Sequence, residues 1–410
     1  MRAQVVLAAA LAFGLLPGAA LAGGLDLPIA YSARQAGMGG TAIAGVNDAS
    51  AVFHNPAGLT GVHGLQVFDN LTLILSNLET SPGYPNQNVQ TGNTLAPAPF
   101  LTAAYRLNHY VALGLGAYPL GAVSGTFHYN DINGIPTLNS QSTIAFEVSP
   151  AIAVTPIKEL SLGVGYRVTI IQFDRHLGGE SNPVLVDVNS LGANFTGLRV
   201  GAQWHPLQEL SLGLVFRPEV NVTTSADSGH LLGLAASNIQ AKLTYPSKLG
   251  AGVRLDLESV SVAADYEFVW NSQFKTIHLS GDLPGQAPIS TDFVFNWSDS
   301  STFKLGAEYR PTPEIALRIG WAWDGPFANT HYPDTFTQPT AAGNYLTLGA
   351  GYKGESWALN LALVYRPDET TVIQTQDIAS QAECRFCTYA GTYSSRLDMA
   401  LVDFSKDFDL

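Results

Sequence analysis

Large apolar side chains recur at every second position along much of this chain. Between Leu160 and Ile170 every even-numbered residue is apolar, whereas the odd-numbered residues are Ser, Gly, Arg or Thr. The same two-residue period returns at 210–217, 315–323 and 357–366. Successive side chains of a β-strand point to opposite faces of the sheet. These stretches therefore predict strands with one apolar face and one small or polar face.

The predicted connections between strands alternate in length. Short turns are expected at 107–109, 156–159, 206–209, 256–259, 311–314 and 353–356, and long polar loops at roughly 77–98, 122–140, 175–192, 223–238, 274–299, 325–342 and 368–395. From Leu65 onward this gives about fourteen strands of roughly 9–15 residues, an even number typical of outer-membrane barrels. A soluble β-sandwich, the alternative, gives no reason for such unequal connections.

The beginning of the chain and its composition support the same fold class. Residues 1–22 are typical of a secretory signal peptide, with Arg2, an apolar run from Val5 to Leu16, and a small-x-small cleavage site ending at Ala22. No later stretch reaches about 18 uninterrupted apolar residues, as a membrane helix would require. Hydrophobic residues make up 46% of the chain and charged residues only 13%. We therefore predict an all-β protein, a 14-stranded antiparallel transmembrane β-barrel formed by residues 65–410.

The formal net charge of −13 argues against a nucleic-acid partner and provides no polybasic membrane patch.

Residues 23–64 precede the first predicted strand and show no strand period. Their glycines permit close packing, and an Asn-Pro step favours a tight turn. A barrel this wide encloses a lumen that side chains of the wall cannot fill, so we expect residues 23–64 to form a hatch inside it. A phosphate-binding loop, the alternative for the glycines, would need a Lys-Ser/Thr pair that is missing. The predicted hatch residues are Gly37, Gly39, Gly40, Asp48, Asn55, Pro56 and Ala57.

The stretch ARQAGMGGTAIAGVNDASAVFHNPAGLTG, followed by about fourteen predicted strands, resembles the FadL/TodX-type outer-membrane transporters of long-chain fatty acids and aromatic hydrocarbons. The similarity is closest over residues 33–61. The resemblance implies passive uptake of hydrophobic compounds across the bacterial outer membrane, without a cofactor or an enzymatic activity. It also implies that cargo leaves sideways, through an opening at a kink in the third strand.

The predicted third strand, YVALGLGAYPLGAVSG, contains a proline that could open the wall. Proline cannot donate a hydrogen bond to the ladder, and glycine weakens a strand. Pairing should therefore fail locally. The alternative is that the strand ends at the proline and a loop begins. The residues concerned are Gly114, Gly116, Pro119 and Gly121.

Arginines recur on the small or polar face of the predicted strands. Inside the lumen a guanidinium group could bind a carboxylate ligand in bidentate fashion, or it could pair with an acidic residue of the hatch or wall. Candidate ligand contacts are Arg167, Arg217 and Arg318, and candidate acidic partners are Asp48, Glu147, Asp265, Glu267 and Glu308.

Cys384 and Cys387 lie in the last predicted long loop. A disulfide is the first expectation in an oxidising compartment, with a metal half-site or a redox motif as alternatives. The histidines show no metal-binding spacing, and no G-x-S-x-G nucleophile motif is present. We therefore predict neither a metal centre nor a catalytic site.

The end of the chain departs from a regular strand pattern. Leu397, Met399 and Leu401 occupy one phase of the alternation, whereas the apolar residues after them occupy the other, and Lys406 interrupts the series. We therefore expect a β-bulge near Leu401.

Three functions fit these observations. The first is a hatch-plugged, monomeric barrel in the outer membrane that imports hydrophobic small molecules and is surrounded by outer-membrane lipid and lipopolysaccharide. The alternatives are a general porin, in which residues 23–64 leave an aqueous pore open, and a structural or adhesive barrel whose loops bind an external partner.

Overall fold

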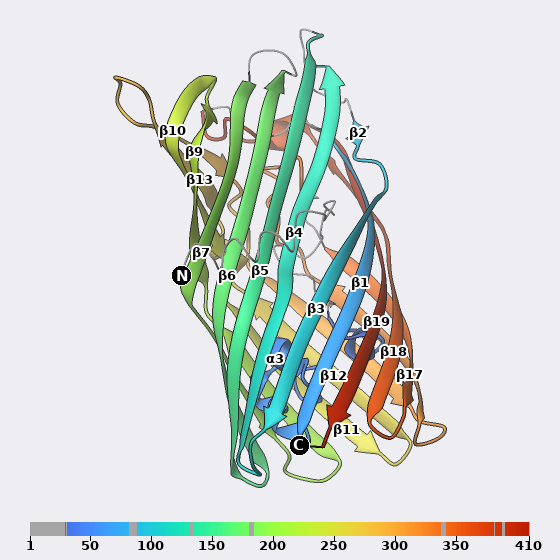
Figure 1. Ribbon diagram of the computed structural model, residues 1–410. Helices are drawn as coiled ribbons and strands as arrows, with labels where there is room; N and C mark the ends of the chain where they lie inside the picture. The colour runs from blue at the N-terminus through green and yellow to red at the C-terminus, as the bar shows by residue number, and fades with distance from the viewer. Residues whose placement is uncertain are drawn as a thin grey trace.

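The computed structural model describes residues 29, 31–81, 88–130, 134–179, 184–337, 342–380, 382–387 and 390–409, which form a closed antiparallel β-barrel (Figure 1). The barrel closes because the first strand pairs with the last, with Leu65 opposite Phe408 and Glu79 opposite Ser394. The prediction of a 14-stranded barrel is confirmed. Its strands are β1 (Leu65–Thr80), β3 (Thr94–Arg106), β4 (Val111–Asn130), β5 (Pro136–Ile157), β6 (Leu160–Gly179), β7 (Val184–Trp204), β8 (Leu210–Arg217), β11 (Lys248–Leu257), β12 (Val260–Val269), β15 (Ser300–Tyr309), β16 (Ile315–Asp324), β17 (Gly343–Lys353), β18 (Trp357–Ile373) and β19 (Gly391–Phe408).

Further short elements extend the wall at the end away from the short turns (Figure 1). β9 follows β8 and pairs with β10, β10 pairs with β13, and β13 pairs with β14. In the described part of the chain these elements are β2 (Val89–Gln90), β9 (Val220–Leu231), β10 (Leu234–Tyr245), β13 (Thr276–Asp282), β14 (Ile289–Val294) and the 3₁₀ turns η2 (Asn271–Gln273) and η3 (Thr375–Asp377).

The outer face of the barrel is apolar. On β6, Leu162, Val164 and Tyr166 are exposed, whereas Gly163 and Arg167 on the other face are buried. An apolar outer band is what the hydrocarbon core of a bilayer requires of a barrel. Exposed residues on other strands continue the band: Leu214, Val253, Leu305, Leu317, Leu348 and Leu361.

No helix among the described residues is long and apolar enough to cross a membrane.

The strands are longer than predicted. β5 has 22 residues and β7 has 21, against the roughly 9–15 expected from the span of a bilayer. The ranges 122–140 and 175–192, predicted as loops, are largely strand, with β4 paired to β5 and β6 paired to β7. These ends of the strands extend beyond the hydrocarbon core, where neither face needs to be apolar. Their polar residues therefore looked like loops in the sequence.

The bulge predicted near Leu401 is wrong. β19 pairs with β1 in continuous register, and the irregularity lies in β18, between Arg366 and Glu369. Leu397, Met399 and Leu401 are buried and join the apolar cluster inside the barrel. The change of phase in the sequence therefore marks an apolar section of the lumen, because these three residues face inward and not toward lipid.

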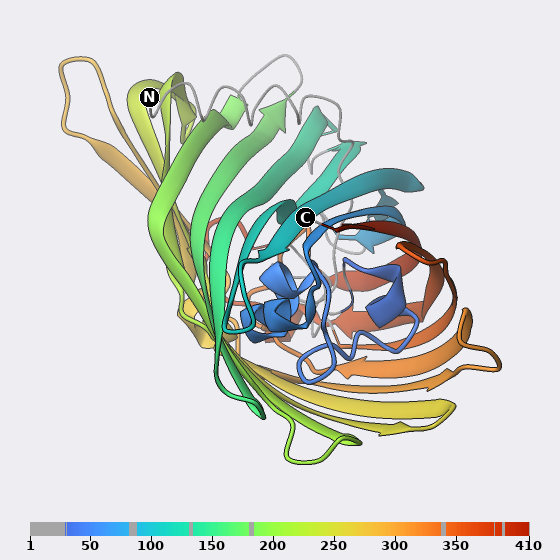
Figure 2. The ribbon, with the colours of Figure 1, turned by 60° about the horizontal axis from the view of Figure 1, so that its bottom comes forward.

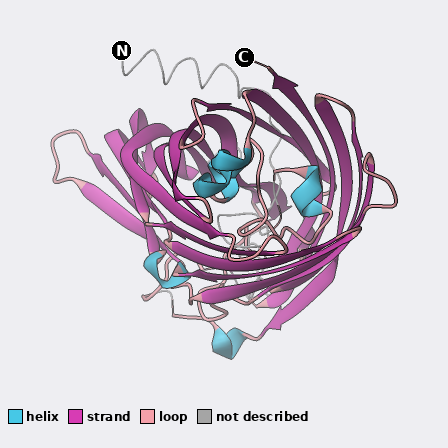
Figure 3. Cartoon of the chain, turned by 90° about the horizontal axis from the view of Figure 1, so that it is seen from below, coloured by secondary structure: helices cyan, strands magenta, loops and turns pink. Residues whose placement is uncertain are grey.

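Residues 31–64, called the N-terminal segment below, lie inside the barrel (Figures 2 and 3). They form the short helices α2 (Ala33–Ala36) and α3 (Ala51–His54) and the 3₁₀ turn η1 (Pro56–Gly61). The predicted signal peptide, 1–22, and residues 23–28 of the predicted hatch lie outside the described residues. Asp265 of β12 holds the segment by accepting the backbone N–H groups of Ala42 and Ile43, at 2.7 and 3.0 Å.

Glycines on the inner face of the wall make room for the N-terminal segment. A Cβ atom added at any of eight of them would lie closer than 3.0 Å to an atom of the segment, a distance that real Cβ contacts essentially never show. Each of the eight lies on a different strand, so the segment contacts much of the circumference. They are Gly114, Gly163, Gly201, Gly213, Gly250, Gly306, Gly320 and Gly349.

Adding a methyl group at one of these wall glycines should therefore weaken the packing of the N-terminal segment against the wall. In Gly163→Ala the new Cβ would overlap the backbone of Pro56 and Ala57, so we expect a loss of about 1–3 kcal/mol of stability and a higher ion conductance in planar bilayers. Gly165→Ala is the matched control on the same face of β6, because its Cβ would meet nothing nearer than the Oγ of Ser149 at 3.4 Å. Equal conductance in the two variants would contradict a seated segment that blocks the lumen.

Candidate functional site at the β3–β4 seam

The wall of the barrel is interrupted between β3 and β4. The two strands pair from Arg106 and Ala112 up to Leu101 and Ala117. Beyond that point the described residues form no β3–β4 pair, although β3 stays paired with β1 as far as Thr94 and β4 with β5 as far as its end. Figure 1 shows the two strands diverging above their paired ends. We call this unpaired stretch the seam.

Pro119 lies just beyond the last β3–β4 pair. The register between β4 and β5 shifts between Pro119 and Gly121, as expected where one residue lacks the N–H group of the ladder. β4 continues through Pro119, so the strand does not end there. Gly114 and Gly116 lie in the paired part of the strand, where a Cβ atom on either residue would crowd Val52 of the N-terminal segment.

Five aromatic side chains fill the inner side of the seam. Phe100 of β3 and Tyr118 of β4 are the first residues beyond the last pair, and their rings stack with centroids 5.0 Å apart. Tyr31 of the N-terminal segment stacks on Phe100 at 5.0 Å, and Phe53 meets Tyr118 edge to face at 5.2 Å. Such pairs add about 0.5–1.5 kcal/mol each to the burial of the rings. We call Tyr31, Phe53, Phe68, Phe100 and Tyr118 the seam cluster.

Tyr31 connects the N-terminal segment directly to the kink. Its hydroxyl donates a hydrogen bond to the carbonyl oxygen of Pro119. Tyr31 and Ser32 have φ values of 48° and 99°, in the region that side chains with a Cβ rarely occupy and that costs about 1–3 kcal/mol per residue. The carbonyl oxygen of Tyr31 lies 2.6 Å from Nε2 of His54. Burial lowers the pKa of His54 to about 4, so the imidazole is neutral at pH 7.

A buried charge network supports the seam cluster from behind. The Glu147 carboxylate accepts hydrogen bonds from the Tyr118 hydroxyl at 2.6 Å and from Nε of Arg167 at 2.5 Å. Arg199 lies 3.2 Å from the same carboxylate and donates to the carbonyl oxygen of Val52 at 2.9 Å. Its guanidinium also lies 5.2 Å from the ring centroid of Phe53. The network thus joins strands β4 to β7 with the N-terminal segment.

The predicted hatch residues lie together in the N-terminal segment. Gly39 and Gly40 have φ values of 69° and 81°, which glycine adopts without strain. Asn55 accepts the N–H of Ala57, donates to the carbonyl oxygen of Ile43 and begins η1, with Pro56 in its first turn. The remaining two are Gly37, packed against Gly349, and Asp48, which lies 3.7 Å from Arg34.

The three arginines proposed as ligand contacts are buried. Arg167 and Arg217 lie near each other, since Nη1 of Arg167 donates to the carbonyl oxygen of Pro218 at 3.5 Å, whereas Arg318 lies on β16. Arg167 pairs with Glu147, and Arg318 pairs with Glu308 at 2.7 Å and donates to Asn360 at 2.9 Å. Arg217 is 6% exposed on β8. The pairing of two of them with carboxylates follows from the cost of burying an unpaired charge.

A polar cleft of about 420 Å³ separates the N-terminal segment from the wall near β16 to β19. Arg34, Asp48, Glu308 and Arg318 are among the residues that line it, together with Glu314 from the short turn before β16. The segment therefore packs against the seam cluster and leaves water-accessible space on its side that faces β15 to β19 and β1.

The residues of the seam cluster were not predicted from the sequence. Phe100 and Tyr118 are buried in the inward phase of their strands, and no role was predicted for inward-facing aromatic residues. A large ring among the small inward residues Ala96, Ala98 and Ala104 of β3 is a signal that could have identified Phe100.

Cys384 and Cys387 form a disulfide bond. Among the residues that the structure describes, no group of three or more His, Cys, Asp or Glu side chains could hold a metal ion.

Comparisons with known proteins agree with this architecture. A family model of outer membrane transport proteins, the OMPP1/FadL/TodX family, matches residues 15–399. A Neisseria meningitidis serogroup B protein named as an outer membrane protein is 32% identical over 87 residues, and the match spans 19% of its length.

Solved structures of similar proteins show the same fold. A Pseudomonas aeruginosa FadL homologue has 16% identity and a TM-score of 0.73, with 96% of this chain and 99% of that chain covered. The toluene transporter TbuX of Ralstonia pickettii has 17% identity and a TM-score of 0.69, with coverage of 93% and 99%. The toluene transporter TodX of Pseudomonas putida has 15% identity and a TM-score of 0.70, with coverage of 94% and 100%. The match to the family model over nearly the whole chain shows that this protein, located in the bacterial outer membrane, belongs to the OMPP1/FadL/TodX family of outer membrane transport proteins.

Proposed function

We propose that this protein carries hydrophobic compounds passively across the outer membrane and releases them sideways through the seam. The observation that carries the proposal is the loss of β3–β4 pairing directly in front of the seam cluster. The solved relatives TodX and TbuX are toluene transporters, which supports an apolar cargo here. The cargo proposed is a long-chain fatty acid or an aromatic hydrocarbon.

Sideways release is favoured by the chemistry of the cargo. Each CH₂ group gains roughly 0.8 kcal/mol when it leaves water for an apolar phase. An acyl chain released into the periplasm would lose that gain, whereas one released into the bilayer keeps it. The lumen supports the same cargo, because Ile74, Phe173, Val186 and Met399 are buried on inward faces of the wall.

We propose that residues 23–64 act as the hatch and that Tyr31 is its latch at the seam. The Tyr31 side chain covers Phe100 and hydrogen-bonds Pro119 across the unpaired stretch. Moving Tyr31 away from Pro119 would uncover the seam and would also relieve the strained backbone at Tyr31 and Ser32. Movement of this short stretch is therefore sufficient to open the path, and the rest of the hatch can stay seated.

The two alternative functions have less support. A general porin needs a permanent aqueous bore, whereas the N-terminal segment packs against glycines of eight strands of the wall. An adhesive barrel would have no use for an unpaired, aromatic-filled seam. Because the β-barrel closes within one chain, we also propose a monomer surrounded by outer-membrane lipid and lipopolysaccharide.

Removing the hydroxyl of the latch tests the role of Tyr31. Tyr31→Phe keeps the stacked ring and loses one buried hydrogen bond, worth about 1 kcal/mol, so the open state should gain population by roughly fivefold. We expect faster uptake of ¹⁴C-palmitate or ¹⁴C-toluene into proteoliposomes. Tyr166→Phe is the control, because it also deletes a hydroxyl bond to a backbone carbonyl, that of Phe195, but on the outer face. Identical rates in the two variants would remove Tyr31 from the mechanism.

Restoring a backbone donor at the kink tests sideways release. Pro119→Ala supplies the missing N–H group, which favours regular pairing of β4, so we expect slower uptake with the barrel still folded. Pro150→Ala is the matched control, since Pro150 lies in β5 opposite Leu115, in the paired region below the seam. If both variants transport at the wild-type rate, release through the seam is contradicted.

A further inference from the structure

Side chains from four separate parts of the chain meet across the lumen, at the end opposite the short turns. Arg175 of β6 lies between two rings, 5.1 Å from the centroids of both Phe293 of β14 and Phe336 of the β16–β17 connection. Phe386, from the β18–β19 connection, stacks on Phe293 with centroids 4.6 Å apart. β6 and β18 lie on opposite sides of the barrel in strand order. We call Arg175, Phe293, Phe336 and Phe386 the crossbar.

The cation of the crossbar differs from the buried arginines near the seam. Arg175 is 5% exposed, and its Nη1 donates to the Asn139 side chain at 2.6 Å and to the backbone oxygens of Ser140 and His176 at 2.9 and 2.8 Å. Its Nε has no hydrogen-bond partner. Asp334 interacts with Arg175 electrostatically, but no carboxylate within the described part of the chain comes within the 4.0 Å of an ion pair. Contacts with aromatic faces are therefore a substantial part of what compensates its buried charge.

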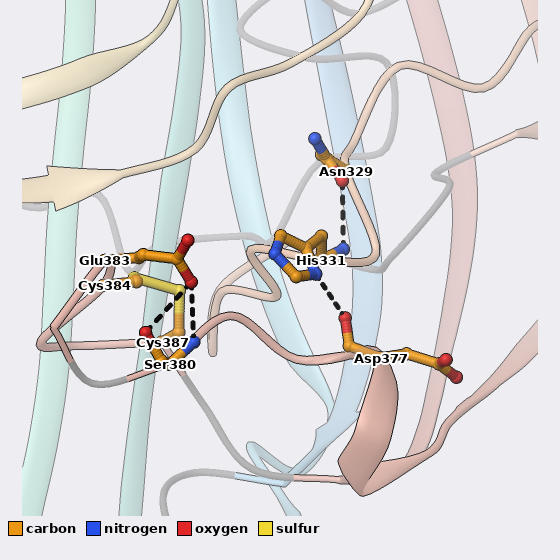
Figure 4. The surroundings of a disulfide bond; sticks show 7 residues. All are labelled: Asn329, His331, Asp377, Ser380, Glu383, Cys384 and Cys387. Atoms are coloured by element: carbon orange, nitrogen blue, oxygen red, sulfur yellow. Dashed lines mark hydrogen bonds between the residues drawn. A yellow bond between two sulfur atoms is a disulfide. The ribbon is translucent and has the colours of Figure 1, made fainter.

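The disulfide fixes the outermost member of the crossbar. Cys384 and Cys387 bracket Phe386, and the backbone N–H of Cys384 donates to the carbonyl oxygen of Ser380 at 2.9 Å. Glu383 accepts the N–H and the hydroxyl of Ser380, at 3.1 and 3.0 Å (Figure 4). The turn that carries Phe386 is thus held in shape by one covalent bond and three local hydrogen bonds.

A second set of contacts attaches this turn to the neighbouring connection. The N–H of Ala379 donates to the carbonyl oxygen of His331 at 2.8 Å, and Nδ1 of His331 lies 2.6 Å from the carbonyl oxygen of Asp377. Figure 4 shows His331 between Asn329 and Asp377. The same connection supplies Phe336, so the two ends of the crossbar are tied to each other as well as stacked.

We propose that the crossbar is a gate at the extracellular end of the lumen, separate from the seam cluster, and that cargo opens it by taking the place of Phe386 on Phe293. The proposal rests on the proposed uptake function. A ring stacked on one face adds little beyond its own burial, so an apolar cargo can replace it. The disulfide limits how far Phe386 can move and so sets how easily the gate opens.

The test uses the accessibility of a thiol placed below the crossbar, a readout that does not depend on transport. Met399 faces the lumen on β19, between the top of that strand and Asp403, which accepts the backbone N–H of Arg34. In a Met399→Cys background, labelling by an uncharged maleimide added to intact cells reports passage of small molecules through the extracellular end. We expect Phe386→Ala to raise the labelling rate severalfold.

The matched variants separate the contribution of the Phe386 ring from that of the disulfide bond. Cys384→Ser with Cys387→Ser keeps Phe386 and removes the bond, and we expect an intermediate rise in labelling. Arg385→Ala, an exposed residue between the two cysteines, should leave the rate unchanged. Thermal unfolding of each purified variant identifies any that has lost the fold.

Each result has a defined meaning. An unchanged or lower rate in Phe386→Ala overturns the gate. A rise in Phe386→Ala without a rise in the double serine variant overturns the role assigned to the disulfide. Uptake of ¹⁴C-palmitate and ¹⁴C-toluene is measured in parallel on the Met399→Cys protein that carries no further substitution. If labelling responds as expected while the parent transports neither compound, the proposed function fails and the gate stands.

Discussion

A strand that crosses a bilayer must pair its backbone on both sides, because hydrocarbon offers no other hydrogen-bond partner. This requirement closes β19 onto β1 and makes the unpaired stretch of wall between β3 and β4 informative. Polar backbone groups can remain unpaired at membrane depth only where protein covers them. Here the N-terminal segment provides the cover, with the Tyr31 hydroxyl bonded to the Pro119 carbonyl oxygen and aromatic rings behind it.

The same segment explains the chemistry of the inner wall. A backbone can approach a strand closely only where the strand has no side chain, and wall glycines provide those places. Buried carboxylates near these glycines each have partners. Asp265 accepts hydrogen bonds from backbone N–H groups of the segment, and Glu147 pairs with both Arg167 and Arg199. Breaking such a buried pair is costly, so these contacts fix most of the segment in place. The strained backbone at Tyr31 and Ser32 is the exception, and it lies where movement would open the wall.

The lumen above the segment is apolar and closed at its far end by a different interaction. There a buried cation lies between two aromatic rings and donates hydrogen bonds to Asn139 and to backbone oxygens, while Asp334 interacts with it beyond ion-pair distance. The two ends of the apolar section are therefore closed by contacts of different kinds, one anchored to a kinked strand and one to a disulfide-bonded turn. In the proposed passive uptake, cargo enters at one of these two contacts before it disturbs the other.

The sequence alone determined the fold class and the number of strands, because the period of the side chains and the alternation of the connections follow directly from the bilayer. It also singled out residues 23–64 for the proposed hatch and Pro119 for the proposed opening, since a proline has the same missing N–H group in any fold. Only the tertiary structure decided which inward residues meet. Phe100 and Tyr118 become neighbours of Tyr31 through strand pairing and the folding of the segment into the barrel, and Leu397 faces the lumen because its register is set by β1. Local patterns record which face a side chain occupies, whereas contacts across a lumen depend on residues that are distant in the chain.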